Sequence, residues 1–343
     1  MFEKKNKLFA IIVAVSLLTV LISFQDSNAA SQGKDVIKIR MVGTLPVGHH
    51  LTDALNLYKK YVEEKSQGRV IVEIFPAQQL YNDKDLVSVL PRGAVDMAIA
   101  NLDMWAGLNP SVSFLTMPLI FDSEDHFYAV AHGEAGDIIN GEFLKVNCKT
   151  LGWIQYGTAD IISKEPYATL EDFKGKRVRA YGQMCQYFLE ALGMAPTMMS
   201  SSEMYQALQK GTIDLAMSGL TSFVSRKLYE VAKYVPDVTL SYNAGAFGTV
   251  ANLDFYNNLP KDIQKILDDG ALEIENFTRE RAKEATVKSR QILLDNGVTF
   301  LKISDEQLAN WKARTLPVMK ARLKENYDSD KVDIMFDALE KHK

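Results

Sequence analysis

The fold is decided by residues 36–75, VIKIRMVGTLPVGHHLTDALNLYKKYVEEKSQGRVIVEIF. Alternating apolar residues from Ile37 predict a strand that ends at Gly43. Apolar residues at helical spacing between Leu51 and Val62 then predict a helix, and residues 70–75 predict a second strand. A strand, a helix and a strand in this order are typical of a βαβ unit in a mainly parallel sheet. The fold class expected is therefore α/β.

A short repeat predicts two similar halves. Residues 92–98 read RGAVDMA and residues 210–216 read KGTIDLA, and each follows a helix-like run. In both, a basic residue and a glycine end the helix before a short apolar strand begins. Joints of this kind also occur in unrelated α/β proteins, which is the alternative explanation.

The same alternation of elements continues to the C-terminus. Residues 176–181 predict a strand, and residues 183–192 predict a helix. The glycine-rich stretch 243–248 leads into a predicted strand that crosses between lobes, and long helices are expected at 262–296 and 305–325. We expect two lobes without a flexible tether. Lobe I would comprise residues 30–153 plus about 243–283, and lobe II residues 154–242 plus about 284–343.

Composition excludes several classes of protein. The chain has 343 residues, with 39 basic and 43 acidic side chains and a net charge of −4, so it has no basic footprint for nucleic acid. Two cysteines are too few for a disulfide scaffold or a four-cysteine zinc site. Cys148 and Cys185 are expected to be buried free thiols, although they could pair in an oxidising compartment.

The N-terminus has the three parts of a secretory signal. Three lysines precede an apolar run from Leu8 to Phe24, and Ser27-Asn28-Ala29 offers a cleavage site after residue 29. A cleaved signal over residues 1–29 would leave an exported, mildly acidic protein. An uncleaved N-terminal anchor is the alternative.

The sequence lacks the motifs of common enzymes and cofactor sites. We find no zinc-protease histidine pair, nucleophile elbow, P-loop or dinucleotide fingerprint. Residues 328–330 begin like a calcium loop, but the pattern breaks at once and a solvated acidic turn is expected. We therefore expect no metal, no cofactor and no catalysis, although a carboxylate pair would leave little trace.

A ligand site is expected where the strands end. Open α/β sheets bind ligands beyond the carboxyl ends of their strands, which here include Asn101, Arg179 and Ser218. Arg179 shares one strand face with Arg177, and a guanidinium at a strand end can hold a carboxylate with two hydrogen bonds. The residues alone favour the alternative, a surface arginine with a solvated ion pair.

Aromatic and histidine side chains near the predicted strand ends and loops are further candidates for the site. Aromatic walls with a few polar groups describe a small-molecule pocket, and core or surface packing is the alternative for each. These candidates are Trp105, Tyr156, Phe223, Tyr242 and His50.

Several segments, in order, resemble the DctP-type solute-binding proteins of TRAP transporters. Over residues 36–320 the resemblance is carried by GRVIVEIFPAQQL at 68–80, RGAVDM at 92–97, MPLIF at 117–121, LEDFKGKRVR at 170–179 and EMYQALQKG at 203–211.

This resemblance implies a monomeric binding protein in the periplasm of a Gram-negative bacterium. Its two lobes would close on a small organic acid, Arg179 would pair with the ligand carboxylate, and small and large membrane subunits would receive the ligand. Ser218-Gly219 stands where many relatives have Asn-Pro, and Ala159 stands near a further arginine of sialic-acid binders. A monocarboxylate with an apolar or aromatic body is therefore favoured over a dicarboxylate.

Two other functions stay open at the level of sequence. One is a secreted α/β enzyme that acts on a small acid, and the other is a periplasmic component that delivers a ligand signal to a receptor.

Overall fold

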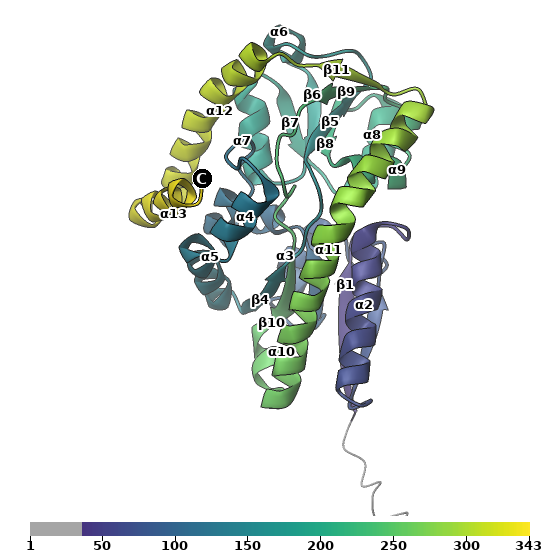
Figure 1. Cartoon of the computed structure of the whole chain (residues 1–343), viewed down its shortest axis with the longest axis vertical. Helices are drawn as coiled ribbons and strands as arrows, with labels where there is room; N and C mark the ends of the chain where they lie inside the picture. Colours follow the sequence, from purple (N-terminus) through teal and green to yellow (C-terminus); the bar gives the residue numbers. More distant parts are fainter. Residues whose placement is uncertain (1–35) are drawn as a thin grey trace, which may run out of the picture.

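Two β-sheets, one in each half of the molecule, form the framework (Figure 1). The computed structural model describes residues 36–343, so the predicted signal at 1–29 lies outside the described residues. The first sheet has the order β2-β1-β3-β10-β4, with β1 (Ile37–Gly43), β2 (Val70–Phe75), β3 (Met97–Ala100), β4 (Cys148–Trp153) and β10 (Gly248–Asn252). The second has the order β11-β9-β5-β8-β6-β7, with β5 (Asp160–Ser163), β6 (Arg177–Ala180), β7 (Ala195–Met198), β8 (Leu215–Ser218), β9 (Tyr234–Asp237) and β11 (Thr299–Lys302). We call the two halves the first and second lobe.

Strand direction confirms an α/β fold with mainly parallel sheets. Within each sheet all strands run the same way except one, β10 in the first and β5 in the second. Both exceptions follow a segment that has just crossed from the other lobe. A chain that crosses between lobes enters the new sheet from the cleft edge, so its strand runs against the others.

Helices cover the sheets of both lobes. The first lobe carries α2 (His50–Lys65), α3 (Asp83–Val89), η1 (Leu102–Trp105), η2 (Pro110–Phe114), α4 (Glu124–Ala131), α5 (Glu134–Lys145) and α10 (Leu253–Asn257). The second carries α6 (Leu170–Phe173), α7 (Gln183–Ala191), η3 (Ser201–Glu203), α8 (Met204–Lys210), α9 (Leu220–Ser225) and η4 (Leu228–Glu230), and the chain ends with α11 (Lys261–Asp295), α12 (Asp305–Asn326) and α13 (Ser329–Lys341). Of the helices in the described part of the chain, none has both the length and the apolar character needed to span a membrane.

The repeat noted in the sequence occupies equivalent places in the two sheets. Gly93 and Gly211 both have a positive φ, 74° and 69°, as a helix-ending glycine requires. The aspartate three residues later then accepts hydrogen bonds from the backbone and guanidinium of an arginine on the neighbouring strand. Asp96 binds Arg40 in this way, and Asp214 binds Arg177. The short motif thus ties the third strand of each sheet to its neighbour.

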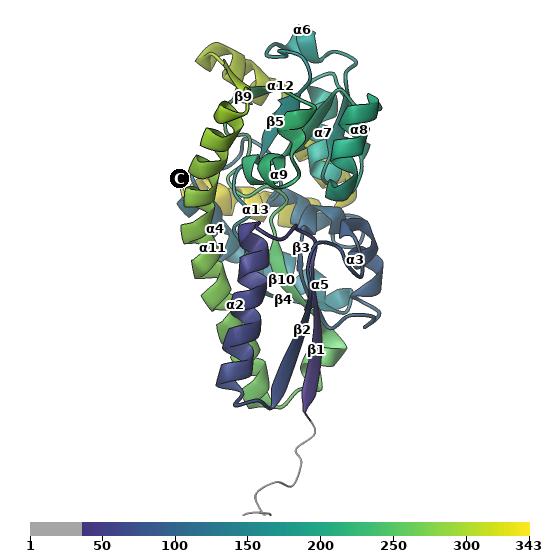
Figure 2. The ribbon, with the colours of Figure 1, turned by 90° about the vertical axis from the view of Figure 1, so that its right-hand side faces the viewer.

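Two crossing segments, 154–159 and 238–247, join the lobes beside helix α11. Ile154 N–H donates to Phe247 O over 2.8 Å, and Ala159 pairs with Ser241. Helix α11 runs along both lobes and lies beside α2 in two perpendicular views (Figures 1 and 2). The lobes are therefore joined by ordered elements.

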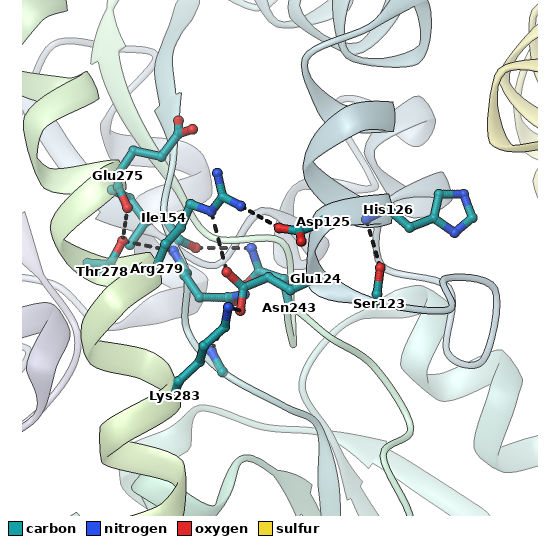
Figure 3. A network of polar contacts seen from close by, with 12 residues as sticks. Ser123, Glu124, Asp125, His126, Ile154, Asn243, Glu275, Thr278, Arg279 and Lys283 are labelled. Carbon is teal, nitrogen blue, oxygen red and sulfur yellow. Dashed lines mark hydrogen bonds and ion pairs between the residues drawn. The ribbon is translucent and has the colours of Figure 1, made fainter. Parts of the chain in front are cut away.

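Helix α11 is bound to both the crossing segment and helix α4 (Figure 3). Thr278 Oγ1 accepts from Gln155 N–H over 3.1 Å, in the middle of the crossing. Arg279 donates to Asp125 over 2.8 Å and to Glu124 over 3.3 Å. These contacts give closure a fixed support, because the crossing cannot bend without moving relative to α11.

The C-terminal segment differs from expectation. The acidic residues 328–330 begin helix α13 and do not form an isolated turn, because Asp328 caps that helix by accepting from Asp330 N–H. Helix α13 packs against α4 and α5 of the first lobe, and Lys331 donates to Glu142 over 2.7 Å. The predicted lobe boundaries, which put residues 284–343 in lobe II, stay a proposal.

Both cysteines are buried and free. Cys148 lies on β4 and Cys185 on α7, in different lobes. Burial raises the pKa of the Cys148 thiol to about 12.

Candidate functional site

A small cavity lies between the lobes at the ends of the central strands. Its walls are Leu45, Asp83, Asn101, Tyr156, Arg179, Tyr181, Ser201, Ser218, Ala244 and Phe247. The cavity leaves about 20 Å³ for the centre of a water-sized sphere, which is room for a water molecule or two. The lobes are therefore in a closed arrangement around this point.

Arg179 supplies the positive charge of the cavity. It lies on β6 with 1% of its surface exposed, its Nε donates to Met199 O over 3.1 Å and its Nη1 donates to Met217 O over 2.8 Å. No carboxylate of residues 36–343 lies within ion-pair distance of its guanidinium. Burial lowers the pKa of Arg179, because the charged form has lost its water. A buried cation without a partner is costly, so this geometry suits an anionic ligand.

Asp83 brings a carboxylate to the opposite side of the cavity. It begins helix α3 of the first lobe, and its Oδ2 accepts from the N–H and the hydroxyl of Ser201 in the second lobe, over 3.2 and 2.9 Å. Its other oxygen, Oδ1, is buried without a hydrogen-bond partner in the described part of the chain. Sequence reasoning missed Asp83, because an acidic residue at a helix N-terminus is common for local reasons.

Two predicted residues form a polar pair on the cavity wall. The hydroxyls of Tyr156 and Ser218 lie 3.0 Å apart, and the Tyr156 ring stacks on Phe247 with centroids 4.8 Å apart. Gly219 follows Ser218, and a β-carbon there would lie 2.7 Å from the Tyr156 ring. A glycine is therefore required for the tyrosine to reach this position.

Asn101 links the lobes next to Arg179. Its Nδ2 donates to Tyr181 O over 3.0 Å, and its Oδ1 accepts from Asp103 N–H. The Tyr181 hydroxyl is buried without a partner among the described residues.

A second buried arginine, Arg226, lies behind the cavity wall. It follows helix α9, and its Nη2 donates to Thr44 O in the first lobe and to Ser201 Oγ in the second, over 3.2 and 2.8 Å. Burial lowers its pKa, and its Nε has no partner among the described residues. Sequence reasoning missed Arg226 because it lies in no strand or motif. The expectation of a single cationic anchor is therefore incomplete, although only Arg179 lines the cavity.

The other four predicted residues do not line the cavity. Trp105 is fully buried against Phe143, with ring centroids 5.9 Å apart, and Phe223 lies in the apolar core of the second lobe. Tyr242 lines two outer grooves. His50 bonds to Gln155 O over 2.9 Å, and burial lowers its pKa to about 4. Their proposed contact with a ligand is not supported by their place in the closed structure.

The described residues offer no cluster of three or more histidine, cysteine or acidic side chains that could hold a metal ion. The cavity therefore presents hydrogen-bonding groups and one unpaired guanidinium. This chemistry suits the binding of an organic anion.

Two α/β lobes that close over a buried arginine define a solute-binding protein of the periplasmic type. Residues 41–326 match the family DctP, described as bacterial extracellular solute-binding protein, family 7, and the chain belongs to this family. It is a solute-binding protein of TRAP-transporter type, as its sequence predicted.

Relatives agree with this assignment. The C4-dicarboxylate-binding periplasmic protein DctP of Rhodobacter capsulatus is 29% identical over 266 residues, which cover 76% of this chain and 79% of that protein. The sugar acid binding protein of Advenella mimigardefordensis, solved with galactonate, has a TM-score of 0.85 at 21% identity and covers 90% of this chain and 100% of its own. A TRAP solute-binding protein of Desulfovibrio salexigens, solved with orotic acid, has a TM-score of 0.84 at 21% identity, with 89% and 99% covered. These two structures confirm the fold.

Proposed function

We propose that the protein captures a small organic acid in its cleft, holds the carboxylate with Arg179, and delivers the acid to the small and large membrane subunits of a TRAP transporter. The observation that carries this proposal is the buried Arg179 guanidinium, which has no carboxylate partner among residues 36–343. A ligand carboxylate would supply the missing charge.

The printed ligands of the relatives support a carboxylate. The proteins described above bind a C4-dicarboxylate, galactonate and orotic acid, which share a carboxylate and differ in the rest of the molecule. Export by a cleavable signal at residues 1–29, location in the periplasm, a monomeric state and the lack of catalysis are parts of the same proposal.

Closure couples binding to a change of shape. Arg179 and Ser218 belong to the second lobe, whereas Asp83 and Asn101 belong to the first. A ligand that contacts both sets favours the closed arrangement, and the membrane subunits can then distinguish loaded from empty protein.

The test compares Arg179→Met with Arg177→Met, a change on the same strand at an exposed arginine that is paired with Asp214. Calorimetry with galactonate, orotate and succinate should show that Arg179→Met lowers affinity roughly 30-fold or more, because truncating a buried charge pair costs about 2–5 kcal/mol. Arg177→Met should leave affinity unchanged. The thermal midpoint of the empty Arg179→Met protein should stay or rise, because an apolar side chain replaces an unpaired buried cation.

Equal affinity of Arg179→Met and the wild type would refute the role of Arg179. Turnover of a bound acid would refute a purely transport function.

A further inference from the structure

We propose that Asp83 selects for hydroxylated monocarboxylic acids by accepting a hydrogen bond from a ligand hydroxyl. This inference rests on the proposed function, because it requires that Arg179 hold the ligand carboxylate. It specifies what the rest of the ligand must carry.

The two oxygens of Asp83 have different environments. Asp83 is 5% exposed, and Oδ2 is already bonded to Ser201. Oδ1 is buried, lacks a partner among the described residues and belongs to a residue of the cavity wall. An ionised carboxylate oxygen can only accept hydrogen bonds, and leaving it unpaired in a buried site is costly. A ligand that brings a donor to Oδ1 is therefore favoured over one that does not.

Charge balance indicates which donor fits. The pKa values of both Arg226 and Arg179 respond to Asp83, so the three charges belong to one site. Two guanidiniums and one carboxylate leave a net charge of +1, which a monoanion neutralises. A second ligand carboxylate would meet the negative charge of Asp83, and an ammonium group would leave the site positive. A hydroxyl satisfies Oδ1 without either cost.

Other polar groups point to the same class. The hydroxyl of Tyr181, on the cavity wall, is buried without a partner, and so is that of Thr44, which lies at the end of β1. A purely apolar or aromatic body would leave these groups unpaired. The ligand inferred from structure is thus a monocarboxylate, as the sequence favoured, but with a hydroxylated body.

Matched acids test the inference on the unaltered protein. Calorimetry would compare D-gluconate with hexanoate and L-lactate with propionate, with succinate and L-alanine as further probes. We expect at least one hydroxylated acid to bind roughly 10- to 100-fold more tightly than its deoxy counterpart, the range for a hydrogen bond to a charged group. It should also bind more tightly than succinate and L-alanine.

Variants separate selectivity from closure. Asp83→Asn keeps the shape of the side chain, weakens the acceptor and removes the negative charge. The hydroxylated acid should then lose affinity while succinate gains it. The control is Lys84→Met, which removes a 3.0 Å bond from Lys84 to Met198 O across the lobes without altering the cavity wall. This control should change the affinity of all the acids by a similar factor.

The outcomes divide cleanly. Equal affinity for hydroxylated and deoxy acids, or tighter binding of succinate or L-alanine by the wild type, would overturn the inference and leave the role of Arg179 standing. A uniform loss for all acids in Asp83→Asn would also overturn it, since Asp83 would then act only in closure. No binding of any acid would overturn the proposed function itself.

Discussion

Gly182 is the place where a single methyl group should block closure. It follows β6 in the second lobe and faces Asp103 of helix η1 in the first, and a β-carbon at Gly182 would overlap the Asp103 carboxylate. The φ of Gly182 is −178°, an extended conformation open to any residue, so Gly182→Ala adds no backbone strain. Its effect should come only from contact between the lobes.

The cost follows from the surroundings of Asp103. This buried carboxylate accepts from Thr116 Oγ1 over 2.8 Å and, more weakly, from Met184 N–H and Cys185 N–H over 3.4 and 3.5 Å at the start of α7. A new methyl group must either displace the carboxylate from these donors or hold the lobes apart. Overpacking of this kind costs about 1–3 kcal/mol, which corresponds to roughly 5- to 150-fold in affinity.

Because the overlap exists only when the lobes are closed, the empty protein should escape it by opening. Calorimetry with the best-binding acid should show the loss of affinity, while the thermal midpoint of the empty protein moves little. Gly141→Ala is the control, since a β-carbon there meets no atom within 4 Å. Wild-type affinity in Gly182→Ala would refute the closed contact between Asp103 and Gly182.

Three further predictions concern other contacts. Arg226→Leu should weaken all ligands by a similar factor in calorimetry, because it removes bonds between the lobes, and a change of selectivity would contradict this. The hydrogen bond with Glu275 raises the pKa of His132, so the stabilisation is present below pH 6.5 and lost as pH rises through the raised value; unfolding midpoints against pH should show this slope in the wild type and not in His132→Gln. Cys148 and Cys185 should resist a thiol reagent in the native protein and react after unfolding, and rapid native labelling would contradict their burial.

Local sequence signals predicted most of the elements. The strand, helix and strand of residues 36–75 are found as β1, α2 and β2, with ends that differ by one or two residues. Periodicity and a terminal glycine suffice there, because each element buries one face. The reversed direction of β5 and β10 was not predictable in this way, since it depends on where the chain crosses between lobes.

The site was less accessible to sequence reasoning. The rule of strand ends, together with the family resemblance, brought Arg179, Asn101 and Ser218 to one cavity, although their contact with a ligand remains a prediction. The same rule also selected Trp105, which lies near a strand end but packs into the core. Proximity along the chain does not determine which way a large side chain points. Asp83 was missed because its unpaired oxygen depends on a partner lobe that the local sequence does not reveal.

The two lobes share a framework but not a charge. Register aligns Met41 with Met97 in the first sheet and Val178 with Leu215 in the second, so the Arg–Asp pair that precedes each of these positions is equivalent. One residue beyond Met41 and Val178, the first lobe has Val42 and the second has Arg179. The guanidinium therefore comes from one lobe alone, while Asp83, with its free carboxylate oxygen, comes from the other. A ligand that satisfies both must touch both lobes, so the asymmetry of two similar lobes is what couples recognition of the acid to closure.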